Sequence, residues 1–162
     1  MSLPDGLLDL LRRPSPCFVA TLMPDGSPQL TETWVTTDGQ HVVLNIVDGM
    51  QKARNLARDA RVAVNVVDPG DVYRYYAVRG RVIDMTTEGG RESIDEISHK
   101  YLGIPYPNFS GNPNETRVLI TIEPTRSHRR PAVDQPWLMR SNSATLVNFT
   151  RGRPCGSPED RS

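Results

Sequence analysis

Two Asp-Gly pairs constrain the fold of this chain more than any other feature, because each adjoins a short run of alternating apolar residues. Asp-Gly beside such a run is the strongest short-range signal of a β-hairpin, and the alternation itself has the period of a half-buried strand. The alternating residues are Phe18, Ala20 and Leu22 before Asp25-Gly26, and Val42, Leu44 and Ile46 after Asp38-Gly39. With Gln29 to Thr36 between the two pairs, the stretch predicts three antiparallel strands joined by tight turns.

The rest of the chain adds further strands and short helices to this core. Gly80 lies inside a long, imperfectly alternating run and marks a predicted bulge or bend. Helices are predicted over 4–13, 50–58 and 87–102 (the last capped by Thr86 or Thr87), and strands over 61–68, 71–85 and 117–123. Six strands with tight turns predict a mainly β, α+β fold: an antiparallel closed or split barrel with short flanking helices.

The helix expected after the third strand has an unusual concentration of positive charge at its start. Asp48 and Gln51 resemble a capping box, and they are followed by Lys52, Arg54, Asn55 and Arg58. Cations at a helix N-terminus oppose the helix dipole, whereas an anion there is favourable. The pattern therefore predicts a phosphate site at the end of the barrel. The alternative is a solvated basic face, partly neutralised by acidic neighbours.

Composition limits the partners of the chain. Its 19 Lys and Arg balance its 19 Asp and Glu, so the overall charge does not favour nucleic acid or a membrane surface. Cys17 and Cys155 form neither a disulfide framework nor a zinc pattern. With no secretory leader and no apolar run of about 20 residues, we expect a cytoplasmic protein that does not span a membrane.

The sequence has no constellation that would perform chemistry by itself. The three histidines are scattered, no metal-ligand spacing occurs, and the chain lacks a nucleophile elbow, a Walker loop and a GxGxxG motif. No catalytic residue and no metal site is therefore predicted. If the chain is an enzyme, its chemistry resides in a bound cofactor. The polar middle strand either faces solvent or lines a groove for a planar ligand.

The last part of the chain differs from the rest. After Pro124 no period is sustained, and the end is rich in Pro, Gly, Ser and Arg. We expect one domain over residues 1–130, followed by a C-terminal arm and flexible tail over 131–162.

Three segments resemble a known group of proteins: ATLMPDGSPQ (20–29), KARNLARDARV (52–62) and KYLGIPYP (100–107). Together they resemble the split-barrel flavin and deazaflavin oxidoreductases, a superfamily that includes pyridoxamine 5′-phosphate oxidase. The closer resemblance is to the branch that uses the deazaflavin coenzyme F420. It covers roughly residues 5–125 and implies a six-stranded split barrel and a homodimer with cofactor sites at its interface.

The resemblance also implies which residues contact the cofactor. In the basic pair that grips the phosphate, only the second member is kept, as Lys52, while the first is Gln51. This departure favours the singly charged phosphodiester of F420 over the phosphomonoester of FMN. The implied positions are Gln29, Leu30, Thr31, Glu32, Thr33, Trp34, Asn45, Ile46, Gln51, Lys52, Arg54, Asn55, Arg58 and, from the other subunit, Tyr75.

The implied function is an F420-dependent oxidoreductase that transfers a hydride to a small electron-poor alkene, enone or imine. The proton would come from water or from Tyr73 or Tyr76. The alternatives are an FMN-dependent oxidoreductase of the same fold, a non-catalytic protein that binds a flavin or tetrapyrrole, and a barrel that binds nothing. Residues typical of a pyridoxamine phosphate substrate site are not recognisable, so vitamin B6 oxidation is not predicted.

Overall fold

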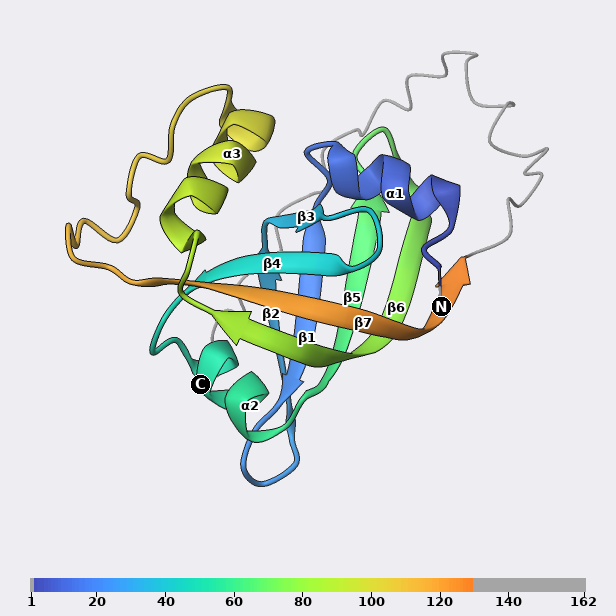
Figure 1. The fold of residues 1–162 in the computed structure, drawn as a ribbon. Coiled ribbons are helices and arrows are strands. Elements are labelled where there is room, and N and C mark those ends of the chain that lie inside the picture. The colour runs from blue at the N-terminus through green and yellow to red at the C-terminus, as the bar shows by residue number, and fades with distance from the viewer. Residues whose placement is uncertain (1, 130–162) are drawn as a thin grey trace, which may run out of the picture. The chain divides into compact units, whose positions relative to one another are not determined.

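The computed structural model describes residues 2–129, which form a curled antiparallel sheet flanked by short helices (Figure 1). The arm and tail predicted for 131–162 lie outside these residues. The helices are α1 (Asp5–Arg12), α2 (Gln51–Arg58) and α3 (Gly90–Leu102). The strands are β1 (Cys17–Leu22), β2 (Pro28–Thr33), β3 (Val35–Thr37), β4 (Val42–Val47), β5 (Arg61–Asp68), β6 (Asp71–Thr86) and β7 (Arg117–Arg129), in the sheet order β2-β1-β5-β6-β7-β4-β3. The mainly β, antiparallel barrel fold is confirmed.

The strand predicted from Gln29 to Thr36 is divided at Trp34, so the described chain has seven strands where six were predicted. The two parts lie at opposite edges of the sheet, β2 beside β1 and β3 beside β4. At the break, the Val35 N–H donates to Tyr101 Oη (3.3 Å) and the Val35 carbonyl accepts from Lys100 Nζ. Side chains of α3 therefore satisfy the backbone groups that the division leaves without a strand partner.

The bulge predicted at Gly80 is confirmed. The β6–β7 register shifts between Arg79 and Gly80. A Cβ at Gly80 would lie 2.6 Å from the Glu123 carbonyl oxygen and 2.7 Å from Ile122 Cγ2, so only glycine fits this approach. Beyond the bulge β7 continues to Arg129, further than predicted, because its polar last residues pair with the first half of β6.

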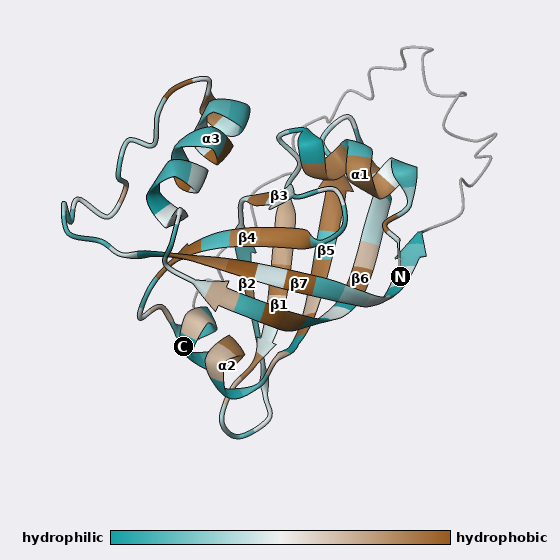
Figure 2. Cartoon of the chain, viewed as in Figure 1, coloured by the Kyte–Doolittle hydropathy of each residue, from teal (hydrophilic) through white to brown (hydrophobic). Residues whose placement is uncertain are grey.

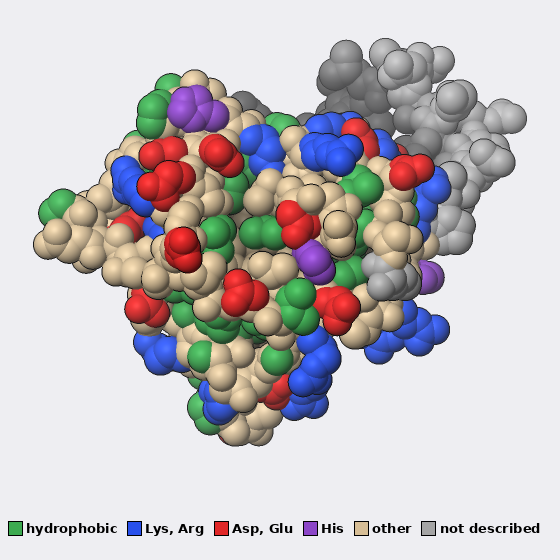
Figure 3. Space-filling view, in the orientation of Figure 1, with side chains coloured by type: hydrophobic (Ala, Val, Ile, Leu, Met, Phe, Trp, Pro, Cys, Tyr) green, Lys and Arg blue, Asp and Glu red, His purple; other side chains and the backbone are tan. Residues whose placement is uncertain are grey.

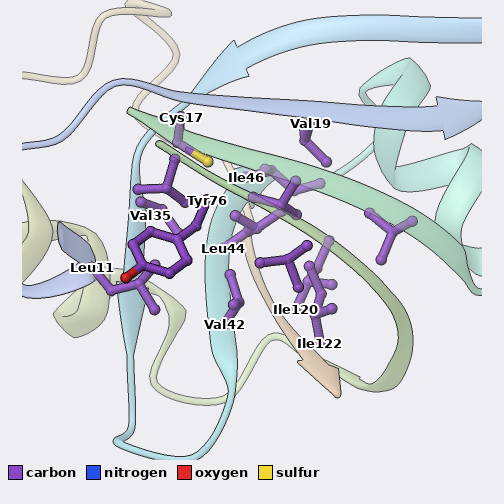
Figure 4. Packing of buried hydrophobic residues seen from close by; sticks show 14 of the residues in the cluster. Leu11, Cys17, Val19, Val35, Val42, Leu44, Ile46, Tyr76, Ile120 and Ile122 are labelled. Atoms are coloured by element: carbon purple, nitrogen blue, oxygen red, sulfur yellow. The ribbon is translucent and has the colours of Figure 1, made fainter. Parts of the chain in front are cut away.

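Apolar residues of the strands and of α1 form the interior of the barrel (Figure 2). Leu7, Leu10 and Leu11 of α1 are fully buried over one end of the barrel. Each buried leucine contributes about 1.5–3 kcal/mol relative to an exposed one, which explains why the short α1 is held in place. Figure 4 shows core side chains from β1, β3, β4, β6 and β7 directed toward one another.

Two predicted helix caps are wrong. The N-cap of α2 is Met50 and that of α3 is Gly89, and neither makes a side-chain capping bond. Asp48 Oδ1 instead accepts from the Gly49 N–H at 2.8 Å. The reason is local, because Gly49 and Gly89 have positive φ angles (+76° and +69°) that turn the chain before each helix begins.

Across residues 2–129, no helix has the length and apolar character needed to span a bilayer.

Candidate functional site

A cavity of about 530 Å³ opens where the β2–β3 break, the end of β4, the start of α2 and the start of α3 come together. Six of the predicted cofactor residues line it: Glu32, Thr33, Trp34, Asn45, Ile46 and Lys52. The remaining lining residues are Val47, Met50, Ile94, Tyr106, Phe109, Ser110 and Arg117. The curl of the sheet thus brings the strand ends and the basic helix, which are separate in sequence, to one place.

Lys52 supplies an ammonium group to this cavity, and no carboxylate of the described residues pairs with it. Its side chain is 8% exposed, and Nζ donates to Thr31 Oγ1 (3.3 Å) and to the Glu32 carbonyl oxygen (3.4 Å). In residues 2–129, no Asp or Glu oxygen lies within ion-pair distance of Lys52. Burial lowers the pKa of Lys52 below its ordinary value, because the charged form loses solvation. An anion bound here would offset this loss and stabilise the ammonium.

The start of α2 adds backbone donors beside Lys52. Among the described residues, no acceptor meets the N–H groups of Gln51, Lys52 and Ala53. Arg54 folds back over this turn, where Nη2 donates to Gln51 Oε1 (2.6 Å) and Nη1 to the Gly49 carbonyl. On the face shown in Figure 3, several carboxylates lie over α3, and Lys and Arg side chains are visible in the lower part of the molecule, where α2 lies. The helix start therefore combines free N–H groups with positive charge, as an anion site requires.

Asn55 and Arg58 are turned away from the cavity. Asn55 is fully buried, and Nδ2 donates to Thr21 Oγ1 (2.9 Å) and Gln29 Oε1 (3.1 Å). Arg58 donates to the Leu22 carbonyl at the other end of α2. These bonds attach α2 to β1 and β2, which gives Asn55 and Gln29 a packing role within one subunit. Leu30, at 66% exposure, lies outside the cavity as well.

Aromatic rings form one wall of the cavity. Trp34 stacks on Tyr101 with centroids 5.0 Å apart, and meets Tyr106 and Phe109 edge to face at 6.2 and 6.1 Å. Arg117 Cζ lies 4.3 Å from the centre of the Tyr106 ring, and Arg117 Nε donates to Glu115 Oε1 at 2.6 Å. The Arg117–Glu115 pair thus fixes the loop that precedes β7 against the wall.

Comparison with known families identifies this architecture. The family model for pyridoxamine 5′-phosphate oxidase matches residues 3–129. The chain belongs to this family.

Solved structures agree with the assignment to the pyridoxamine 5′-phosphate oxidase family. A protein described as an F420 reductase is 32% identical, with a TM-score of 0.65, over 78% of this chain and 98% of that one. The conserved hypothetical protein Rv2991 of Mycobacterium tuberculosis is 25% identical, with a TM-score of 0.58, over 78% of this chain and 84% of that one. HupZ of Group A Streptococcus, at 18% identity, shares the fold with a TM-score of 0.56 over 80% of this chain and 95% of that one. A comparison with curated proteins finds no match.

The cavity residues fit the flavin-type cofactor that this family implies. Asn45 Nδ2 donates to the Gly90 carbonyl at 2.7 Å, while Asn45 Oδ1 is buried without a hydrogen-bond partner in the described chain. A buried acceptor of this kind is costly unless a ligand donates to it. With Lys52 for an anion and Trp34 and Tyr106 for a flat ring, the cavity offers complementary chemistry to each part of such a cofactor.

Two tyrosines predicted as proton donors do not line the cavity. Tyr76 is 5% exposed and lies in the core with Leu11 and Val35 (Figure 4), so it is excluded as a donor to a ligand in the cavity. Tyr73, at the start of β6, is half exposed and also outside the cavity lining. Tyr75 does not reach the cavity of its own chain, which leaves its contact with a second subunit as a prediction.

The residues that the sequence analysis missed are mainly those of the aromatic wall. Tyr106 belongs to the segment KYLGIPYP, which contributed to the resemblance but was given no contact role. Phe109 and Ser110 follow it in a loop without a period. The available signal was the clustering of aromatic residues in a polar loop, since exposed rings often mark a binding surface.

Proposed function

We propose that this protein is an F420-dependent oxidoreductase that transfers a hydride between the deazaflavin coenzyme and a small electron-poor alkene, enone or imine. The observation that supports this most is Lys52, a buried lysine at the cavity that has no Asp or Glu of residues 2–129 within ion-pair distance. Such a group is favourable in a folded protein when an anionic ligand offsets its loss of solvation.

The preference for F420 over FMN rests on the charge around Lys52. Gln51 occupies the position where the resemblance places a second phosphate-binding cation, and its Nε2 donates to Asn55 Oδ1 at 2.9 Å. One ammonium and the backbone N–H groups of α2 match a singly charged phosphodiester better than a doubly charged phosphomonoester. The 32% identity to a protein described as an F420 reductase supports the same choice.

The chain itself supplies binding, orientation and a dry environment. Lys52 and the first N–H groups of α2 would hold the phosphate, and Asn45 Oδ1 would accept a hydrogen bond from the polar edge of the ring. Trp34, Tyr106 and Phe109 form a wall that excludes water from one side of the cavity. The bound coenzyme supplies the hydride chemistry, and orientation by the protein can lower the barrier by roughly 7–11 kcal/mol.

A homodimer completes the proposed site. The cavity is open on one side in a single chain, and we propose that a second copy closes it, with Tyr75 of that copy reaching the cofactor. No side chain of the cavity is required as a base, and the proton that accompanies the hydride is drawn from water.

Titration of the purified protein with F420 and with FMN, side by side, tests the proposal. We expect tight binding of F420, weak binding of FMN, and oxidation of reduced F420 when an enone is added. Tight FMN binding with the flavin absorbance band would favour an FMN-dependent oxidoreductase. Binding without turnover of any hydride acceptor would indicate a carrier of a flavin or tetrapyrrole, and absence of all binding would reject a redox function.

A further inference from the structure

A second hollow, of about 410 Å³, lies on the outer face of β1, β5 and β6 and shares no lining residue with the first cavity. Its floor is small, because Ala20 of β1 faces Ala63 of β5 in the register. Longer side chains rise around this floor. They are Leu22 and Pro28 on one side, and Arg61, Arg79 and Arg81 on the other.

Arginines on this face stand directly opposite one another. In the β5–β6 register Arg61 is the partner of Arg81, and in the β6–β7 register Arg79 is the partner of Arg126. Residues that are direct partners in an antiparallel sheet project to the same face, and like charges placed in this way are destabilising. Two such pairs side by side are an arrangement that the fold alone does not favour.

Acidic neighbours neutralise only part of this charge. Asp59 pairs with Arg61 at 2.6 Å, and hydrogen bonds from Arg61 lower the pKa of Asp59 to about 2. Glu123 is the register partner of Arg81 but forms no ion pair with it. Over residues 2–129, the guanidinium groups of Arg79, Arg81 and Arg126 make no ion pair. The two carboxylates named above therefore leave most of the positive charge of the four arginines without a partner.

We propose that this hollow is a binding site for a small multivalent anion, which carries two or more phosphate or carboxylate groups. Direct partners across strands are about 5 Å apart, and successive residues on one face of a strand are about 7 Å apart. The guanidinium groups of the two arginine pairs are therefore too far apart for one phosphate or carboxylate group to contact all of them. A ligand with two such groups can contact both pairs. The planar guanidinium fork binds phosphate and carboxylate oxygens bidentately, and the apolar side of the hollow accommodates the body of the ligand.

None of the lining residues of this site lines the first cavity, although Arg79 and Arg81 share a face of β6 with Tyr75, which the proposed dimer turns toward a second copy. Its test is calorimetric titration and thermal unfolding of the full chain at low ionic strength, where surface charge is least screened. The probes are inorganic phosphate, pyrophosphate and citrate. We expect pyrophosphate or citrate to bind more tightly than phosphate, and the comparison between these two decides between phosphate and carboxylate ligands.

The variant Arg79→Gln distinguishes a binding site from a structural role. It should weaken binding of the multivalent anion by about tenfold or more, because one charge-assisted contact is lost. Without ligand, its unfolding temperature should stay the same or rise, because the repulsion with Arg126 is removed. Arg12→Gln, which changes the net charge equally at an exposed position of α1, should alter neither property.

Three outcomes would overturn the proposal. The first is unchanged anion binding in Arg79→Gln. The second is loss of binding in Lys52→Met, which would assign the anion to the first cavity. The third is a change of subunit association in Arg79→Gln, measured by sedimentation, without any effect on anion binding, which would make this face a contact with a second copy.

Discussion

At the scale of single residues, Lys52 and Asn45 share an unusual condition. Each is buried at the cavity, and each has a polar group that residues 2–129 satisfy incompletely: an ammonium without a carboxylate in that range and an amide oxygen without a donor in it. Such groups reduce the stability of a fold unless a ligand supplies the missing partner. We therefore expect changes at these positions to affect binding more than folding.

The substitution Lys52→Met tests this expectation, because methionine keeps much of the side-chain volume and removes the charge. We expect F420 binding to weaken by about 1.5–3 kcal/mol, the value of a hydrogen bond to a charged group. The free energy of unfolding should change little, because removal of the desolvation cost of the charge offsets the loss of the two long hydrogen bonds to Thr31 Oγ1 and the Glu32 carbonyl. Calorimetric titration and urea unfolding measure the two effects separately. An unchanged affinity would contradict the phosphate assignment, and Arg12→Gln serves as the control for net charge.

At the scale of elements, the β2–β3 break at Trp34 depends on α3. Lys100 Nζ donates to the Leu11 carbonyl at 2.8 Å and to the Val35 carbonyl, and Tyr101 Oη donates to the Ser15 carbonyl at 2.7 Å. These bonds connect the end of α1, the break and α3. Because Trp34 lines the cavity and stacks on Tyr101, the same bonds set the position of the cavity wall.

Lys100 gives this junction a pH dependence. Burial lowers the pKa of Lys100 from 10.5 to about 8, so between these values the unfolded chain binds more protons than the folded one. Stability from this group therefore increases as pH rises from 8 to 10.5. Urea unfolding should show that the free energy of unfolding of the unchanged chain gains on that of Lys100→Met as pH rises from 8 to 10.5. The variant should also be less stable by about 1–3 kcal/mol, because two carbonyls lose their donor.

Cys17 also titrates at alkaline pH, so its effect on stability has to be separated from that of Lys100. Burial raises the pKa of Cys17 to about 12, which removes stability as pH rises above its ordinary value in the unfolded chain. Cys17 is present in both proteins, so its contribution cancels in the difference apart from the effect of the Lys100 charge, which lowers the pKa of Cys17. A difference in stability that does not vary with pH would show that Lys100 is not perturbed as described.

The bulge at Gly80 allows a sharper test of backbone packing. Gly80→Ala would place a methyl group 2.6 Å from the Glu123 carbonyl oxygen, and neither backbone can move without disturbing the β6–β7 pairing. We expect a loss of at least about 2 kcal/mol in the free energy of unfolding, measured with urea. Gly70→Ala is the matched control, since its nearest contact, Asp68 Oδ1, would be 3.5 Å away. Equal effects of the two substitutions would contradict this account.

At the scale of the whole molecule, the main core within residues 2–129 runs from Leu3 to Ile122. A chain that ends at residue 131 should therefore fold and bind F420 with the affinity of the full chain. Thermal unfolding and titration of the shortened protein check this prediction. Loss of folding would show that residues 132–162 are part of the core, and loss of binding alone would show that they contribute to the site.

Much of the barrel could be predicted from the sequence because its signals are local. Each Asp-Gly pair turns the chain within a few residues, and Gly26 and Gly39 have the positive φ angles that such turns need. The alternation of Phe18, Ala20 and Leu22 likewise depends only on neighbours along one strand. The basic start of α2 is local in the same sense, so Lys52 could be predicted at the site.

Other features depend on residues far apart in sequence and could not be predicted in this way. Division of the middle strand at Trp34 requires hydrogen bonds from Lys100 and Tyr101, which are more than sixty positions away. The aromatic wall forms only when the loop after α3 returns to β2, and the buried position of Tyr76 follows from the packing of α1 over β6.

The sequence by itself determined the turns, the strand pattern and the position of the basic helix, because these arise from backbone preferences and periodicity over a few residues. Only the tertiary structure decided which of the polar residues face the cavity and which are used in packing. Asn55 and Lys52 illustrate the reason. They are three positions apart on one short helix, yet contacts with β1 enclose the first, while the second remains open to a ligand.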